Sequence, residues 1–180
     1  PVAGLTLNAN GSYSFDPADA AYNSLAAGQT RVVEANYTVS DGRGGTATST
    51  LILTVTGTND LPVVVADTAT ATEDAAQVTG TVAANDSDVD ATDVLTYTLD
   101  APVAGLLLNN NGTYSFDPQN AAYQSLALGQ TQAVVANITV SDGNGGVVPT
   151  TLTITVTGTN DAPVAVADVA TATEDAAVVT

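Results

Sequence analysis

The chain repeats itself after 101 residues, and this repeat constrains its fold more than any other feature. Residues 1–79 align without a gap to residues 102–180, and 57 of the 79 aligned positions are identical. A unit of this length is large enough to bury a hydrophobic core of its own, whereas the units of solenoid proteins are much shorter. We therefore expect tandem domains of about 100 residues rather than a solenoid.

The boundary between successive units is expected at a turn-rich segment that occurs twice. The sequence GTNDLP at 57–62 returns as GTNDAP at 158–163, each time between two valine-rich runs. Proline lacks a backbone N–H, so it interrupts strand pairing at this point. On this division, residues 1–60 are the C-terminal part (strands D–G) of one repeat, residues 61–161 are a complete repeat, and residues 162–180 are the first strands of the next.

Short β-rich segments fill the complete repeat. Alternation of apolar and polar residues and enrichment in Val, Thr and Ile predict seven strands, with Asn- and Gly-rich hairpin turns at 109–112 and 142–146. Seven short strands in about 100 residues are typical of an immunoglobulin-like Greek-key β-sandwich, so the fold class is all-β. The predicted large core residues are Tyr97, Tyr114, Phe116 and Tyr123. The predicted strands are 63–70, 77–83, 94–99, 105–108, 113–116, 132–140 and 147–157.

The composition excludes several classes of function. The chain carries 19 acidic and 2 basic residues, a formal net charge of −17, and no His, Cys or Lys. It therefore lacks disulfides, a Ser-His-Asp triad and a phosphate-binding lysine. Nucleic acid and anionic membrane surfaces are poor partners because binding them requires basic side chains. At 44% hydrophobic residues, the chain has enough apolar surface for a core, and no apolar run is long enough to predict insertion into a membrane.

Alternation of strand direction sorts the acidic residues into two groups at opposite ends of the predicted sandwich. The complete repeat, taken as 62–162, contains ten Asp and one Glu but no Lys or Arg that could form a salt bridge with them. One end is predicted to gather Asn59, Asp60, Asp86, Asp88, Asp90, Asp93 and Asp142. The other is predicted to gather Glu73, Asp74, Asp100, Asp117, Asn120, Asn160 and Asp161.

These oxygen-rich groups favour Ca²⁺, which takes about six to eight oxygen ligands from carboxylates, amides and carbonyls. Magnesium fits less well because it retains water, and the loop at 85–93 does not match the glycine and glutamate positions of an EF-hand. The alternative is that these residues only form turns, for which Asp and Asn are well suited. This alternative is strongest for Asp67 and Asp168, and it is open for Asp16 and Asp117, which precede proline. The predicted Ca²⁺ ligands are Asn59, Asp60, Glu73, Asp74, Asp86, Asp88, Asp90, Asp117, Asp142, Asn160 and Asp161.

Several motifs, occurring in order in both copies, resemble the VCBS repeat of large bacterial surface proteins, including RTX-type adhesins. The linker is also similar, more loosely, to the calcium-binding junction between cadherin domains. The resemblance implies a cadherin-like fold, secretion to the bacterial cell surface, calcium dependence and a role in adhesion. It rests on the segments Phe116-Asp117-Pro118, Ala122-Tyr123, Thr139-Val140-Ser141-Asp142-Gly143, Thr157-Gly158-Thr159-Asn160-Asp161, Thr-Glu-Asp at 72–74 and Asn-Asp-Ser-Asp at 85–88.

The leading hypothesis is therefore an extender, or spacer, repeat of an extracellular adhesin or fibre, stiffened by Ca²⁺ at its junctions with neighbouring repeats. A glycan- or ligand-binding module is the alternative, although no exposed aromatic patch is evident in the sequence. A further alternative is a fibre subunit in which the first strands of one copy pair with the sheets of another, giving a head-to-tail homo-oligomer. An enzyme is not expected, because few carboxylates are available outside the loop clusters.

Overall fold

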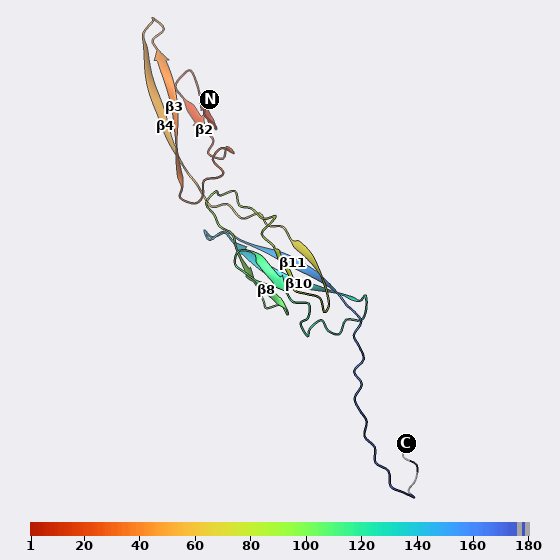
Figure 1. Ribbon diagram of the computed structural model, residues 1–180. Helices are drawn as coiled ribbons and strands as arrows, with labels where there is room; N and C mark the ends of the chain where they lie inside the picture. The colour runs from red at the N-terminus through yellow and green to blue at the C-terminus, as the bar shows by residue number, and fades with distance from the viewer. Residues whose placement is uncertain (176–177, 179–180) are drawn as a thin grey trace.

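The computed structural model describes residues 1–175 and residue 178. It consists of two β-rich regions arranged end to end, followed by an extended C-terminal segment (Figure 1). The first region spans residues 1–56 and the second spans residues 67–157. The described part of the chain contains no helix that is long and apolar enough to cross a lipid bilayer.

The second region is a sandwich of two sheets. One sheet has the strand order β5-β11-β10-β7 and the other has the order β6-β9-β8. All pairs are antiparallel except β5 and β11, which run parallel with Asp67 opposite Leu152 and Thr72 opposite Thr157. The strands are β5 (Asp67–Thr72), β6 (Val78–Thr81), β7 (Thr96–Leu99), β8 (Leu106–Leu108), β9 (Thr113–Phe116), β10 (Thr131–Ser141) and β11 (Val147–Thr157).

These strands confirm the all-β prediction, with one informative difference. A strand was predicted at 63–70, but β5 begins at Asp67. The residues before it form an isolated bridge, in which the backbone groups of Val63 and Ser87 exchange two hydrogen bonds of 2.8 and 3.0 Å. The segment therefore contacts the loop between β6 and β7 first and pairs with β11 afterwards. A chain that changes its pairing partner in this way cannot continue as one regular strand.

A single apolar core lies between the two sheets. Tyr97, Phe116 and Tyr123 are at most 2% exposed, and the rings of Phe116 and Tyr123 lie 5.2 Å apart. The Tyr123 hydroxyl donates a 2.6 Å hydrogen bond to the carbonyl of Ala104, which satisfies the polar atom of a buried ring. Together with buried Tyr114, these residues confirm the predicted aromatic members of the core.

The first region repeats half of this architecture. Its strands are β1 (Leu5–Leu7), β2 (Tyr13–Phe15), β3 (Thr30–Ser40) and β4 (Thr46–Thr56), paired as β1-β2 and β3-β4. Its core is smaller and more open: Val39 on β3 is 57% exposed, whereas Val140, its equivalent on β10, is fully buried. The difference arises because β10 also pairs with β7, while β3 pairs only with β4 among the residues that the structure describes.

The two regions offer a matched pair for testing the core. Phe116→Ala removes a fully buried ring, so we expect a loss of about 3–5 kcal/mol in the free energy of unfolding. Phe15 occupies the equivalent position in the first region and is only half-buried, so Phe15→Ala should cost clearly less. Urea unfolding followed by circular dichroism measures both, and equal costs would contradict a core centred on Phe116.

Candidate metal centre at the linkers

Three segments that are distant in sequence converge where the first region meets the second. They are the linker at 57–62, the loop that joins β6 to β7, and the turn that joins β10 to β11. β6 and β10 both run towards this end of the sandwich, so the loops that follow them must lie there. The acidic residues that gather here, with their amide neighbour, are named the upper cluster: Asn59, Asp60, Asp88, Asp90, Asp93 and Asp142.

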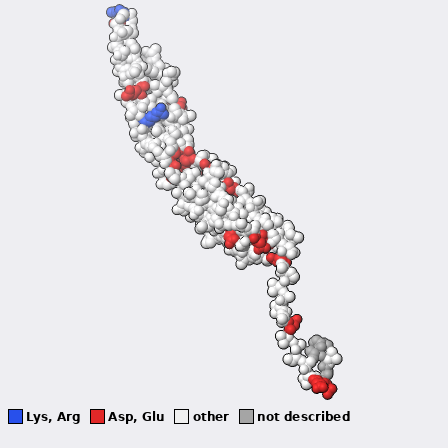
Figure 2. Space-filling view, in the orientation of Figure 1, with Lys and Arg blue, Asp and Glu red and all other residues white. Residues whose placement is uncertain are grey.

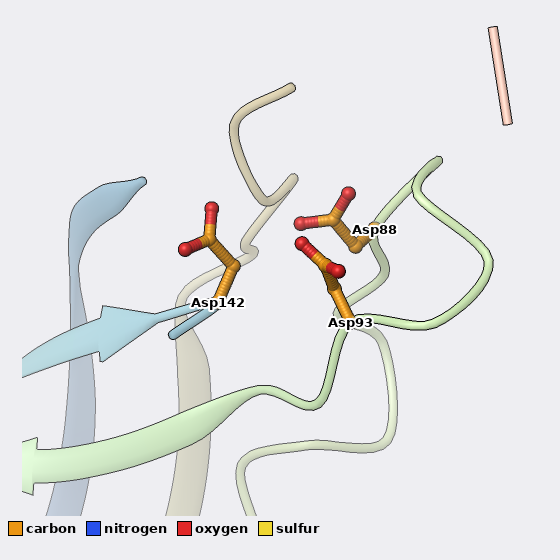
Figure 3. Close-up of side chains that lie close together, drawn as sticks. All are labelled: Asp88, Asp93 and Asp142. Carbon is orange, nitrogen blue, oxygen red and sulfur yellow. The ribbon is translucent and has the colours of Figure 1, made fainter. Parts of the chain in front are cut away.

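Three carboxylates form the centre of the upper cluster. One oxygen atom each from Asp88, Asp93 and Asp142 lies within 4.8 Å of the other two, a spacing at which one cation could contact all three. In Figure 3 the carboxylates of Asp88 and Asp93, from one loop, lie next to each other, and Asp142 comes from a second loop beside them. Asp142 is 3% exposed and the other two are half-buried, so water screens their mutual repulsion only in part.

Asp142 is held in its ionised form by hydrogen bonds. Burial would by itself raise its pKa, but the side-chain amide of Asn59 and backbone N–H groups of the turn outweigh this effect, and the pKa is lowered. The N–H groups of Asn144 and Gly146 donate to its Oδ1 at 2.7 and 2.9 Å. A Cβ at residue 146 would overlap the Asp142 carboxylate, so a larger residue there would push the carboxylate away from its donors. The turn therefore presents a fixed negative charge to the cluster.

The linker is attached to this centre directly. The Asn59 amide donates to Asp142 Oδ2 at 2.9 Å, and the backbone N–H of Asp60 donates to Asp90 Oδ2 at 2.9 Å. The N–H of Asp90 in turn donates to Asp88 Oδ1 at 3.0 Å. A ligand bound among these carboxylates would therefore contact groups that hold the linker in place.

Several oxygen atoms in the upper cluster are buried without a hydrogen-bond partner. They are Oδ1 of Asn59, Oδ2 of Asp88, Oδ1 of Asp90 and Oδ2 of Asp93. Leaving a buried acceptor unpaired costs about 1–3 kcal/mol, and more when the group is charged. All four are hard oxygen donors, which is the ligand type that Ca²⁺ prefers. The residues present thus fit a hard divalent cation.

No basic side chain neutralises this charge. Both arginines precede residue 44 in the sequence, and the guanidinium of Arg31 bonds the Ala21 carbonyl at 2.9 Å and lies over the Tyr22 ring. In Figure 2 the basic atoms lie only in the upper part of the molecule, while acidic atoms recur along its whole length. Any neutralisation of the upper cluster must therefore come from solution.

Asp86 was predicted to join this group, but it faces a different neighbour. Its Oδ1 accepts a 2.8 Å hydrogen bond from the N–H of Val65. The pKa of the Asp67 carboxyl is raised, mainly by burial and in addition by the negative charge of nearby Asp86. The Asn85 amide, which donates to Asp67 at 3.3 Å, opposes this rise. Burial, together with the Asp86 carboxylate, likewise raises the pKa of the Tyr97 hydroxyl. Asp86 therefore anchors the segment before β5.

The opposite end of the sandwich holds a second acidic group, named the lower cluster: Glu73, Asp74, Asp117, Asn160 and Asp161. Glu73 is 1% exposed; its Oε2 accepts from the N–H of Thr159 at 2.9 Å, while its buried Oε1 has no partner. Asp74 accepts from the Thr159 hydroxyl at 3.0 Å. The following linker therefore contacts this end as the preceding linker contacts the other.

The remaining predicted residues of the lower end have looser roles. Gln119 links Asp117 to Asp74: its backbone N–H bonds the Asp117 carboxylate, and its side-chain amide bonds the Asp74 carbonyl. Asn160 and Asp161 are exposed. The side-chain amide of Asn160 donates to the Asp161 carbonyl, and in the first linker the amide of Asn59 donates to the Asp60 carbonyl in the same way. Asp100 accepts from the Thr139 hydroxyl, and Asn120 accepts from the N–H of Ala122 within a turn.

Sequence reasoning placed Asp93 in the acidic loop but did not select it as a ligand. In the structure it lies in the central triad, and its Oδ1 accepts from the Asn144 amide at 2.8 Å. Asp93 falls outside the alternating Asp-x-Asp pattern of Asp86, Asp88 and Asp90, on which the prediction was based. Its position depends on the return of the loop towards β7, which the pattern does not encode.

The raised pKa of Asp67 predicts a pH-dependent effect of substitution. Because the folded state raises this pKa above its ordinary value of 3.8, ionisation of Asp67 lowers stability as the pH rises. Asp67→Asn should therefore raise the melting temperature at neutral pH in the presence of chelator, and the difference should vanish below pH 3.8. Thermal melts over a pH series measure it, with Asp168→Asn, at the exposed equivalent position, as the control. A lower melting temperature for Asp67→Asn at neutral pH would contradict the assignment.

Comparisons with known proteins agree with this architecture. Solved structures with similar folds include human mucin-like protocadherin EC1-2 (TM-score 0.52, 18% identity, 87% of this chain and 79% of that one). Drosophila N-cadherin EC1-4 and mouse cadherin-23 EC22-24 each give a TM-score of 0.50 at 14% identity over 88% of this chain. The chain spans 40% and 50%, respectively, of those two structures. At such identities the likeness concerns the fold alone. No curated protein matches the sequence.

Two family models match the sequence. The model described as a bacterial Ig domain matches residues 1–54. The model described as a bacterial cadherin-like domain matches residues 59–158, which is more than half of the chain and includes both the linker residues Asn59 and Asp60 and every strand of the second region. The chain belongs to the bacterial cadherin-like domain family.

Proposed function

We propose that this chain is an extender segment of a secreted bacterial surface adhesin or extracellular fibre, and that Ca²⁺ bound at the linkers makes it rigid. The observation that carries the proposal is the upper cluster. There the linker bonds directly to Asp90 and Asp142, and Asp88, Asp90 and Asp93 each have a buried oxygen without a partner. The family model and the VCBS-like motifs support a place among extracellular repeats.

The proposed mechanism is a change in stiffness at the linker. Without a cation, the carboxylates of Asp88, Asp93 and Asp142 repel one another across the point where two loops and the linker meet. A bound Ca²⁺ would convert this repulsion into attraction and hold all three segments together. The loop between β6 and β7 already contacts the first region. The N–H of Ala91 donates to the Ser24 carbonyl at 3.4 Å, and the Gln29 amide donates to the Thr92 hydroxyl at 3.3 Å.

The repeat supplies the second half of the proposed site. Asn160 and Asp161 are the equivalents of Asn59 and Asp60 one period later, and the lower cluster lies beside them. In a tandem array, each linker would therefore have Glu73, Asp74 and Asp117 of one repeat on one side and the upper cluster of the next repeat on the other. The combined set provides enough carboxylate and amide oxygens for the coordination number of Ca²⁺.

Calcium affinity in the range of extracellular modules would suit this role. Such modules have dissociation constants of about 10⁻⁴–10⁻³ M, so they fill outside the cell and stay empty inside it. The chain would then be flexible before export and stiff afterwards. A spacer of this kind would hold other domains at a distance from the surface, so the proposed role does not specify an adhesive ligand.

Small-angle X-ray scattering of the 180-residue chain tests the proposal. In millimolar calcium we expect a longer maximum dimension and a narrower distance distribution than in excess chelator, together with a higher melting temperature. The same measurement in magnesium provides the control for ionic strength. A scattering curve and a melting temperature that calcium leaves unchanged would refute the proposed role of the metal.

A charge-neutralising substitution locates the ion. Asp88→Asn removes one carboxylate of the triad with little change in shape, and we expect it to weaken calcium binding at least about tenfold, because ligand charge sets affinity in such sites. Isothermal titration calorimetry measures the affinity. Asp100→Asn serves as the matched control, because Asp100 belongs to neither cluster and is exposed, with its carboxylate bonded to the Thr139 hydroxyl. Equal affinities for the two variants would place the ion elsewhere.

A further inference from the structure

A side chain outside the predicted ligand set connects the two loops of the upper cluster. Asn144 lies in the turn between β10 and β11, and its side-chain amide donates to Asp93 Oδ1 at 2.8 Å, across 51 residues of sequence. The backbone N–H of Asp93 donates to the Asp90 carbonyl at 3.1 Å, so the loop between β6 and β7 turns at this point. Asn144 therefore holds the Asp93 carboxylate in place from a different loop.

Asn144 makes this contact without adding charge. Its amide donates a hydrogen bond but is neutral, so the negative charges of Asp88, Asp93 and Asp142 remain uncompensated. Buried oxygens of Asp88 and Asp93 have no hydrogen-bond partner, and neither has Oδ1 of Asp90, a residue that is only 2% exposed. The amide thus positions one carboxylate and leaves these buried oxygens for a cation to contact.

The first region shows that an arginine fits the same turn. The equivalent of Asn144 one period earlier is Arg43, and the two turns, SDGRGG and SDGNGG, are otherwise identical in sequence. The backbone N–H of Arg43 donates to Asp41 Oδ1 at 2.8 Å. The N–H of Asn144 donates to Asp142 Oδ1 at 2.7 Å in the same way. The backbone of the turn therefore accepts either side chain.

We propose that the side chain at position 144 determines whether the upper cluster requires a metal ion, and that Asn144 keeps this linker dependent on a cation from solution. Because Asn144 is exposed, a longer side chain can be placed there without disturbing the core. An arginine would bring a permanent positive charge and several N–H donors to the unpaired carboxylate oxygens. Its guanidinium would then take the place of the cation. The inference rests on the proposed function, because it concerns the same site.

Charges of opposite sign at position 144 should have opposite effects. A positive charge attracts the carboxylates in the absence of calcium and competes with calcium when the ion is present. A further carboxylate repels them in the absence of calcium and offers an additional ligand when the ion is present. If Asn144 only supported the fold of the turn, its replacement by either charge would lower stability. The sign of the change therefore separates control of charge from support of structure.

Two substitutions in the 180-residue chain measure this contrast. For Asn144→Arg we expect calcium affinity to fall at least about tenfold in isothermal titration calorimetry, because ligand charge sets affinity in such sites. We also expect its melting temperature in excess chelator to lie above that of the unchanged chain. For Asn144→Asp we expect a lower melting temperature in chelator and a larger rise when calcium is added.

Small-angle X-ray scattering in excess chelator gives a mechanical readout of the same effect. The guanidinium of Asn144→Arg would hold the two loops of the upper cluster together without a metal ion. We therefore expect this variant to show, in chelator, the longer maximum dimension that the unchanged chain shows only in calcium. Added calcium should then change its scattering curve little.

Asn137→Arg is the matched control, because it makes the same change of charge away from the site. Asn137 is exposed on β10, and its distance along the strand places it about 17 Å from Asp142. This distance exceeds the screening length of about 8 Å at physiological ionic strength, so calcium affinity should stay as in the unchanged chain. Asn144→Gln lengthens the side chain but adds no charge, so its melting temperature in chelator should not rise.

The outcomes separate this inference from the proposed function. If the unchanged chain binds calcium and Asn144→Arg binds it equally well, the proposed function stands and the inference is overturned. Lower melting temperatures in chelator for both Asn144→Arg and Asn144→Asp would also overturn it, because they would indicate a purely structural role. An equal loss of calcium affinity in Asn137→Arg would do the same. An unchanged chain that does not bind calcium would overturn both proposals together.

Discussion

The parallel pairing of β5 with β11 is the constraint on which the arrangement of this molecule depends. It brings the strand that follows the linker alongside the last strand of the same sandwich and in the same direction, so the chain enters the sandwich at one end and leaves it at the other. Loops after β6 and β10 then lie beside the preceding linker, and the turn after β5 lies beside the following one. The acidic residues are gathered at the two ends because the loops that carry them lie there.

The two ends of the sandwich carry carboxylates that no basic side chain neutralises. A buried carboxylate is ordinarily compensated by a basic partner or by several donors. Asp142 has its donors, whereas Asp88, Asp93 and Glu73 each keep a buried oxygen without a partner, in a stretch of sequence that has no Lys or Arg. The linkers are thus sites at which the ionic composition of the solution can control the mechanics of the chain.

Much of the fold could be predicted because its signals are local. Apolar alternation marked β9 and β11 at their observed bounds, and it placed the four aromatic side chains in the core. The start of β5 was predicted too early, because valines at 63–65 favour a strand whether their partner is β11 or Ser87. Similarly, the Asp-x-Asp pattern indicated an acidic loop but could not distinguish Asp86, which bonds Val65, from Asp93, which joins Asp88 and Asp142.

The sequence by itself determined the repeat, the all-β class, the strand periodicity and the absence of basic partners for the acidic loops, because each is a property of neighbouring residues or of composition. Only the tertiary structure decided which carboxylates share a space and which segment each strand pairs with. Those properties depend on how loops return and how strands pair over 80 or more residues, as between Asn59 and Asp142. No local pattern encodes such distances, since they are set by the packing of two sheets around one core.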